Sequence, residues 1–238
     1  PKFYMIIFLL ILTLLGIIKY GVNKTLPQIL IAIVIGILLD LAINYFKDKR
    51  VIFPSSAIIT GLLIATGLST GTELYIPAIL TAIAVISKHT IKINNRHIFN
   101  PANFGLLFGI VIIGSGVQWW ASDVLWLLIP LGLFLTYKVK RHFIIISYLI
   151  TNLALSIILS LIIKNNILEY LLILNPFFVL FMLIEPVTSP TKDKGKVVFG
   201  ILFSLFLFLF YLVLPKYDPF ILGLTVANLI VPLLNKLD

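Results

Sequence analysis

The chain has 238 residues, of which 61% are hydrophobic and only 11% are charged, and its mean hydropathy is +1.15. This composition excludes a soluble globular domain and indicates a protein that crosses a membrane several times. The formal net charge of +9 comes from basic residues in short loops, and it therefore favours membrane orientation over nucleic-acid binding. Because the chain has no cysteine, it cannot by itself hold a disulfide, a thioether-linked haem or a cysteine-ligated iron–sulfur cluster.

Ten apolar segments follow one another along the chain and show no strand-type alternation. They cover residues 3–18, 26–46, 54–68, 74–88, 101–114, 119–137, 142–163, 167–184, 197–214 and 218–235. We therefore predict an all-α polytopic membrane protein that forms a single membrane domain over residues 1–238. Three of the segments span only about 21 Å as helices, against a hydrocarbon core of about 30 Å. There we expect half-length or broken helices, whose non-helical backbone must be buried in protein.

Along the ten predicted spans, loops rich in Lys and Arg alternate with loops that have few of them. Counted loop by loop, 14 of the 18 Lys and Arg residues fall on the side that holds both termini. Cytoplasmic loops of membrane proteins carry such an excess of Lys and Arg. We therefore expect a multi-pass protein of the inner (cytoplasmic) cell membrane, in contact with the lipid bilayer, with both termini in the cytoplasm.

The second half of the sequence repeats a pattern of the first half. In each half an aromatic residue, Asn or Asp, and Pro are followed by small residues four and eight positions after the proline. The two copies are Phe99-Asn100-Pro101 with Gly105 and Gly109, and Tyr217-Asp218-Pro219 with Gly223 and Ala227. The polar residue can cap a helix, the proline fits its first turn, and the small residues allow close helix contact. With ten spans the copies run in opposite directions, which predicts a five-plus-five inverted repeat (residues 1–116 and 117–238) and a site where the halves meet.

Two polar stretches in the first repeat are candidates for a buried site. Residues 54–67 carry small and hydroxyl side chains, which suit either a buried ligand or ordinary helix packing. In residues 94–105, Asn100 and Asn103 share one helix face and offer donors and acceptors that suit the edge of a heteroaromatic ring. Helix capping alone would explain Asn100 and leave Asn103 without a role.

A third polar stretch, residues 185–196, begins with a carboxylate at the end of an apolar run. Ionisable residues close to a membrane core are functional candidates, although Glu185 can equally be a simple interfacial charge.

The histidines fall beside Lys or Arg near predicted cytoplasmic helix ends, a placement that does not suit a haem pair. We expect the tryptophans to anchor the outer end of the sixth segment at the membrane interface. The histidines are His89, His97 and His142, and the tryptophans are Trp119, Trp120 and Trp126.

Four sequence boxes, taken in order, resemble a known family. They are Ser-Ala-x-x-Thr-Gly-Leu-Leu at 56–63, Phe-Asn-Pro-Ala at 99–102, acidic-Pro-Val-Thr-Ser-Pro…Lys-Gly at 185–195 and Ala-Asn-Leu-Ile-Val-Pro-Leu-Leu at 227–234. Together they resemble the RnfD protein of the Rnf ion-translocating electron transport complex and the related NqrB protein of Na⁺-translocating NADH:quinone reductase. The resemblance covers roughly residues 30–238.

The resemblance implies a membrane subunit of a flavin-dependent, ion-translocating oxidoreductase complex, with other membrane redox subunits as partners. It also implies a noncovalent flavin (riboflavin or FMN) within the helices. A second flavin of the family, FMN, is esterified to the threonine of a Ser-Gly-Ala-Thr motif between helices five and six. The corresponding loop here, residues 114–123, contains no threonine. We therefore expect no covalent FMN in this chain.

The predicted cofactor-binding residues combine the resemblance with the polar stretches, and no metal site is expected. They are Thr60, Gly61, Lys88, Arg96, Asn100, Pro101, Asn103, Glu185, Thr188 and Ser189. The two asparagines would bond to the flavin edge, and Thr60 and Gly61 would line the facing helix. A cation, Lys88 or Arg96, would favour a reduced anionic flavin. The alternatives are a small-solute or ion channel or transporter on the same repeat without a cofactor, favoured by the altered loop, and a membrane scaffold that only anchors partner subunits.

Overall fold

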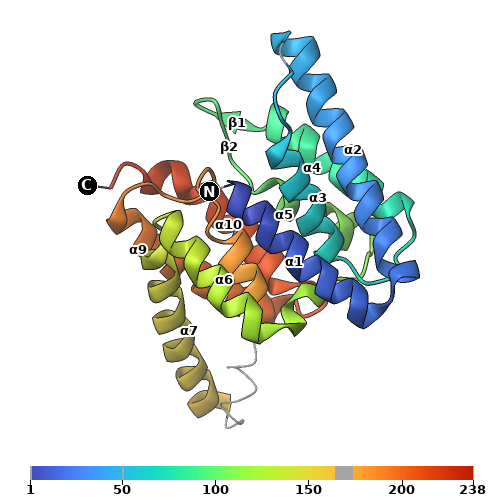
Figure 1. The fold of residues 1–238 in the computed structure, drawn as a ribbon. Coiled ribbons are helices and arrows are strands. Elements are labelled where there is room, and N and C mark those ends of the chain that lie inside the picture. The colour runs from blue at the N-terminus through green and yellow to red at the C-terminus, as the bar shows by residue number, and fades with distance from the viewer. Residues whose placement is uncertain (1, 50, 164–173, 238) are drawn as a thin grey trace.

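The computed structural model describes residues 2–49, 51–163 and 174–237, and helices dominate it (Figure 1). The first half holds α1 (Lys2–Tyr20), α2 (Val22–Asp48), α3 (Ser55–Gly67), α4 (Tyr75–Thr90), a hairpin of β1 (Lys92–Ile93) and β2 (Arg96–His97), and α5 (Pro101–Phe108), which continues as a π-helix (Gly109–Ile113). The second half holds a 3₁₀ turn (Trp120–Asp123), α6 (Leu125–Lys138), α7 (His142–Ile163), a π-helix η3 (Phe178–Met182), α9 (Asp193–Val213) and α10 (Pro219–Leu234).

The prediction of an all-α polytopic membrane protein is confirmed. The helices α1, α2, α7 and α9 are long and apolar enough to cross a membrane, and α3, α4, α5, α6 and α10 are shorter apolar helices. The predicted segment 167–184 falls partly on residues 164–173, which lie outside the described residues.

The short helix α3 ends inside the protein and is completed by another part of the chain. The carbonyl of Gly67 accepts hydrogen bonds from the backbone N–H groups of Gln118 (2.9 Å) and Trp119 (3.2 Å). Leu68 also forms a β-bridge with Val117. Backbone polar groups at membrane depth need such partners within the protein, and the loop after α5 supplies them.

The prediction that all three tryptophans anchor at the membrane interface is wrong for two of them. Trp119 is 7% exposed and Trp120 is 1% exposed, whereas Trp126 is exposed as expected. The Trp119 indole N–H donates to Asp218 Oδ2 (2.7 Å), and that of Trp120 donates to the Ala65 carbonyl (3.1 Å). The loop folds back over the end of α3 and carries both rings inward, which local sequence does not signal.

The two Asn/Asp-Pro segments begin helices in the same way. Asn100 Oδ1 accepts the N–H of Asn103 at the start of α5 (3.1 Å), and Asp218 Oδ1 accepts the N–H groups of Phe220 and Ile221 at the start of α10. The predicted caps are therefore confirmed. The glycine four residues after each proline lies against an equivalent helix, α4 for α5 and α9 for α10. These matching contacts agree with an inverted repeat, although its boundaries stay a prediction.

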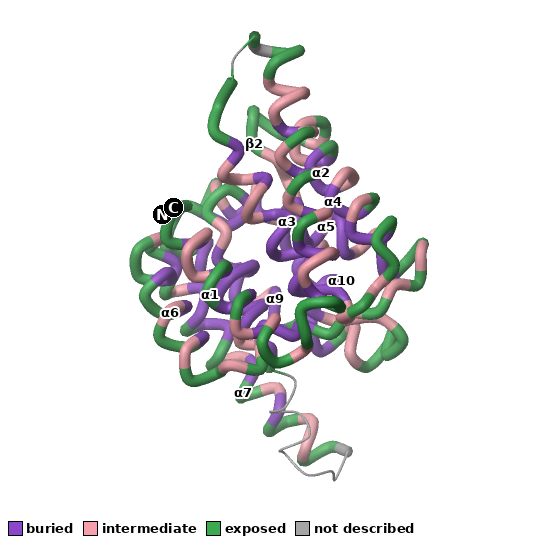
Figure 2. The backbone as a smooth tube through the Cα atoms, turned by 45° about the vertical axis from the view of Figure 1, so that its right-hand side comes forward, coloured by how far each residue is buried: buried purple, intermediate pink, exposed green. Residues whose placement is uncertain are grey.

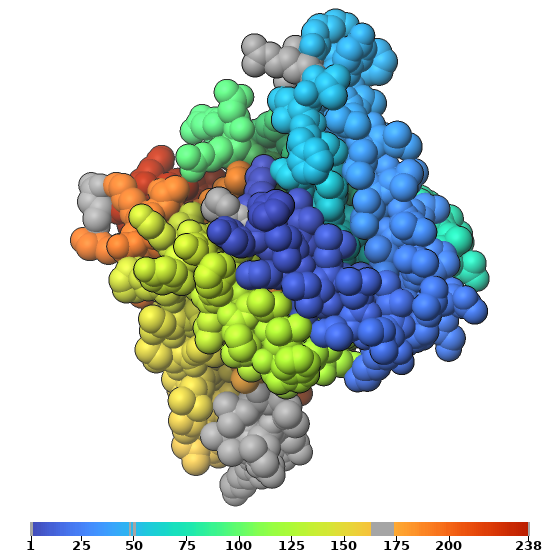
Figure 3. Space-filling view, in the orientation of Figure 1, coloured from blue at the N-terminus to red at the C-terminus, as the bar shows by residue number. Residues whose placement is uncertain are grey.

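Helices α5 and α10 pack against each other where the halves meet, and α3 lies beside α5. Figure 2 shows that buried residues gather around these three helices, while the far ends of α2 and α7 are mainly exposed or half-buried. On the face seen in Figure 3, α1 in dark blue runs across the molecule beside α6 in yellow-green. The centre of the molecule is thus made of segments from both halves.

The membrane orientation predicts which loops face outward. Single cysteines at Lys24 and Gln118 should react with an impermeant thiol reagent added outside sealed cells, because both positions lie in the predicted outer loops. A cysteine at Lys140 should be protected until the membrane is opened. All three side chains are exposed, and the cysteine-free chain gives no background. Labelling at Lys140 in intact cells would reverse the orientation.

Candidate functional site

A cavity of about 550 Å³ lies between segments of the two halves. Residues of α1 and α3, the start of α5, the end of α6 and the segment after η3 form its walls. Those that line it are Lys2, Phe3, Met5, Ser56, Ile59, Thr60, Leu63, Asn100, Pro101, Leu135, Val139, Phe181, Ile184, Glu185, Pro186 and Val187. Four of the predicted site residues, Thr60, Asn100, Pro101 and Glu185, therefore meet at one cavity, although they come from distant parts of the sequence.

The walls of this cavity are mainly apolar, with polar groups at a few points. Thr60 Oγ1 donates to the Ser56 carbonyl (2.9 Å), so its oxygen lone pairs stay available to accept. Asn100 uses one amide hydrogen and one lone pair of its carbonyl oxygen within the protein, so one of each remains. An apolar slot with a few fixed donors and acceptors is typical of cofactor sites.

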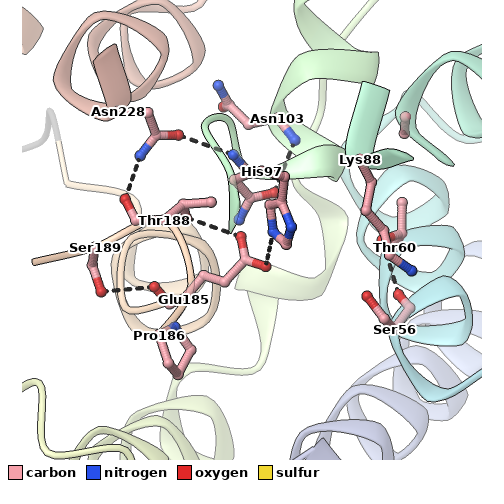
Figure 4. Close-up of polar contacts among 12 residues, drawn as sticks. Ser56, Thr60, Lys88, His97, Asn103, Glu185, Pro186, Thr188, Ser189 and Asn228 are labelled. Carbon is pink, nitrogen blue, oxygen red and sulfur yellow. Dashed lines mark hydrogen bonds and ion pairs between the residues drawn. The ribbon is translucent and has the colours of Figure 1, made fainter. Parts of the chain in front are cut away.

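Asn228 of α10, which the sequence analysis did not assign to the site, joins the two halves beside the cavity (Figure 4). Its Oδ1 accepts the backbone N–H of Asn100 (3.0 Å), and its Nδ2 donates to the Thr188 carbonyl (3.0 Å). Asn100 Nδ2 in turn donates to the Met182 carbonyl (3.2 Å). Asn100 and Asn228 are almost fully buried. This network fixes the start of α5 relative to the segment 182–188.

Glu185 is held at the edge of the cavity by neighbours on two segments. The hydroxyl of Thr188 donates to Glu185 Oε2 (3.0 Å), and His97 Nε2 lies 3.3 Å from Glu185 Oε1 (Figure 4). Ser189, another predicted site residue, is buried, and its hydroxyl donates to the Glu185 backbone carbonyl (2.7 Å). Thr188 and Ser189 therefore position Glu185 and do not line this cavity.

Arg141 fastens the same segment to the loop between α6 and α7. Its Nε donates to Ser189 Oγ (2.8 Å), and one terminal nitrogen donates to the Pro186 carbonyl (3.1 Å). The side chain is buried, and this burial lowers the pKa of the Arg141 guanidinium from its usual value. Nothing in the local sequence separates this arginine from the neighbouring surface Lys residues.

Two predicted site residues lie away from the cavity, on the side of α2. The ammonium of Lys88 bonds to Asp40 Oδ1 (2.7 Å), which His89 Nε2 also contacts (2.8 Å). Gly61 faces α2, where an added Cβ would lie 2.9 Å from the Ala32 carbonyl oxygen. Lys88 therefore has a carboxylate partner inside the protein, and Gly61 serves the close approach of two helices.

Asn103 ties α5 to α10 instead of facing the cavity. It is fully buried, and its Nδ2 donates to the Ile221 carbonyl (3.1 Å) and to Thr225 Oγ1 (2.9 Å). Its Oδ1 has no hydrogen-bond partner among the described residues. Asn103, which helix capping left without a role, therefore joins the two halves by hydrogen bonds.

A second, separate pocket of about 360 Å³ holds two further predicted residues. The β1–β2 hairpin, residues 187–188 and the C-terminal end of α10 enclose it, and both Arg96 and Thr188 line it. Val187 lines both hollows, so the segment after Glu185 separates them. Six of the ten predicted site residues are therefore divided between two neighbouring hollows, and the other four line neither of them: Gly61, Lys88, Asn103 and Ser189.

Comparison with known proteins gives the family. A family model described as the NQR2, RnfD, RnfE family matches residues 2–125 and 106–237. The chain belongs to the NQR2/RnfD/RnfE family. It is therefore a membrane subunit of Rnf/Nqr-type complexes, in which other membrane subunits are its partners. A search of curated proteins found no match.

The four boxes on which the resemblance to RnfD and NqrB rested meet at one place in the structure. Thr60 of the first box and Asn100 of the second line the cavity, and so does Glu185 of the third. Asn228 of the fourth box holds Asn100 through its side-chain oxygen. The boxes of this NQR2/RnfD/RnfE member thus form the cavity and the network beside it.

The role of Asn103 can be separated from that of the cavity by substitution. Asn103→Leu should lower stability by about 1–3 kcal/mol, because the Ile221 carbonyl and the Thr225 hydroxyl lose a buried donor. Thr225→Val is the matched control, since it removes one of these two contacts and should cost less. Thermal unfolding in detergent measures both. An Asn103→Leu protein as stable as the wild type would contradict the structural role.

Proposed function

We propose that the 550 Å³ cavity binds a noncovalent flavin and that the chain serves electron transfer within an Rnf/Nqr-type complex. The observation that carries this proposal is the meeting of Thr60, Asn100 and Glu185 at one cavity between the halves. Its volume lies within the range of about 300–1,000 Å³ found for small-molecule and cofactor sites. Inverted repeats place their binding sites in the same position, at the repeat interface.

The chemistry of the residues that line the cavity supports a flavin as its ligand. Leu63, Phe181 and Ile184 offer apolar surface for the faces of a planar tricycle. Asn100 offers a remaining donor and acceptor for the ring edge, and Thr60 offers an acceptor. Because Asn100 is tied to Asn228 and Met182, its amide is fixed before any ligand binds. Such preorganisation reduces the entropy lost on binding.

The protein would contribute binding, orientation and electrostatics, while the flavin supplies the electron chemistry. Lys2 lines the cavity and places a cation beside it, a role expected from the sequence for Lys88 or Arg96. A nearby cation favours the anionic form of a bound group. The Glu185 carboxylate, which also lines the cavity, opposes this effect, but Thr188 donates a hydrogen bond to it.

The absorption spectrum of protein purified in mild detergent tests the proposal. We expect a flavin spectrum in the folded protein. After acid precipitation the flavin should stay in the supernatant and the protein band should not fluoresce in a gel, because residues 114–123 contain no acceptor threonine. A folded, colourless protein would reject the flavin site and favour a cofactor-free channel or transporter on the same fold. A fluorescent denatured band would show covalent attachment.

A further inference from the structure

We propose that the pocket between the β1–β2 hairpin and the end of α10 binds the phosphate of an anionic phospholipid headgroup. The pocket measures about 360 Å³ and contains Arg96 and His97, and none of the described residues that line it carries a carboxylate. The Arg96 side chain is exposed and forms no ion pair with any described residue. A guanidinium left unpaired on a concave surface is suited to bidentate contact with phosphate oxygens.

The hairpin fixes the position of this arginine. Lys92 pairs with His97 and Ile93 pairs with Arg96, and the turn between them consists of Asn94 and Asn95. Both asparagines have positive φ, 49° and 62°, as a two-residue turn with two left-handed residues requires. The short loop therefore holds Arg96 on the pocket wall, which lowers the entropy cost of binding an anion.

The rest of the lining provides both hydrogen-bond donors and apolar surface. Asn235 Oδ1 accepts from the backbone N–H (2.9 Å) and hydroxyl (3.1 Å) of Thr191, which leaves its Nδ2 as a donor. Val231 and Pro232 of α10 and the exposed Val187 supply apolar surface. Polar donors together with apolar surface in one pocket suit a headgroup phosphate and the glycerol backbone attached to it.

Two features near the pocket carry negative charge that would repel an anion. Neighbouring groups form hydrogen bonds or close polar contacts with both of them. The carboxylate of Glu185 lines the other cavity and is in contact with His97 and Thr188. The C-terminal end of α10 carries partial negative charge. There the carbonyls of residues 231, 233 and 234 each accept a backbone N–H from residues 235–237, so they do not point unpaired at the pocket.

The depth of the pocket favours a lipid as the source of the phosphate. It lies at the C-terminal end of α10, beside the hairpin that follows α4, where the apolar spans give way to polar chain. Lys92 and Lys236, both exposed, add positive charge next to its residues in the sequence. Basic pockets at the ends of membrane helices are typical sites for anionic headgroups.

Native mass spectrometry of the detergent-purified chain with added lipids tests the proposal. The wild type should retain dioleoyl phosphatidylglycerol in preference to dioleoyl phosphatidylcholine, and Arg96→Gln should reduce retention of phosphatidylglycerol at least about tenfold. Lys92→Gln is the matched control, because it removes a cation from the same hairpin but outside the pocket lining, and it should change retention much less. Asn95→Gly keeps the left-handed turn and lies outside the pocket lining, so it should change retention little.

A second arm separates lipid from soluble phosphate. Inorganic phosphate, compared with chloride at equal ionic strength, should neither displace phosphatidylglycerol nor raise the melting temperature. If it does both through Arg96, the pocket serves a soluble phosphate ligand and the lipid assignment is wrong. Equal losses in Arg96→Gln and Lys92→Gln would reduce the effect to general surface charge and would also overturn the proposal. Because Arg96 does not line the flavin cavity, bound flavin should be unchanged in Arg96→Gln, which keeps the two proposals separately testable.

Discussion

Gly105→Ala should be among the most damaging single substitutions in this chain. A Cβ at Gly105 would lie 2.6 Å from the Leu80 carbonyl oxygen and 3.1 Å from Ala84 Cβ, both on α4. Backbone atoms of a packed helix cannot turn aside as a side chain can, so α5 must shift. Overpacking of this kind costs about 1–3 kcal/mol, which corresponds to a fall in melting temperature of roughly 3–10 °C for a chain of this size.

The equivalent glycine of the second half provides a matched control. A Cβ at Gly223 would lie 3.3 Å from the Leu207 backbone nitrogen, so a shift of a few tenths of an ångström suffices. We expect Gly223→Ala to be nearly as stable as the wild type in the same thermal unfolding measurement. Equal effects of the two substitutions, or a stable Gly105→Ala, would mean that α4 and α5 are not as close as the structure shows.

Filling the cavity should remove the flavin while the fold is kept. Ile59 of α3 lines the cavity and is only half-buried, so Ile59→Trp adds an indole into existing space instead of into packed atoms. We expect bound flavin per protein to fall at least about tenfold with little change in melting temperature. The measurement is flavin released by denaturation, divided by protein concentration.

The control for this substitution places the same bulk elsewhere. Ile79 on α4 is 42% exposed and does not line the cavity, so Ile79→Trp should keep its flavin. Should Ile59→Trp retain full flavin and full stability, the cofactor would have to bind outside this cavity. Loss of flavin in both variants would indicate a general effect of added tryptophan.

Much of the helical framework follows from the sequence because burial in lipid imposes a strong local signal. The predicted segment 54–68 appears as Ser55–Gly67, and 142–163 appears as His142–Ile163. The caps at Asn100 and Asp218 were predictable, since they depend on residues within three positions. The sixth segment was extended wrongly to residue 119, because the apolar residues there belong to a loop that folds inward on α3.

The site was predictable only in part, because its contacts join distant segments. Thr60, Asn100 and Glu185 line the same cavity, as the sequence boxes suggested. Local spacing could not show that Lys88 of α4 would form an ion pair with Asp40 of α2. Nor could it show that Asn103 points to α10, or that Asn228 holds Asn100. These hydrogen bonds join residues 48 to 128 positions apart, so they depend on how separate helices pack. Helix periodicity carries no information on that packing.

Quantifying the flavin in wild-type protein, extracted gently and separated from free flavin, tests the central claim most directly. We predict about one noncovalent flavin per chain, released fully by denaturation and strongly reduced in Ile59→Trp but not in Ile79→Trp. A well-folded wild type without flavin would contradict the claim that the cavity between the halves is a flavin site.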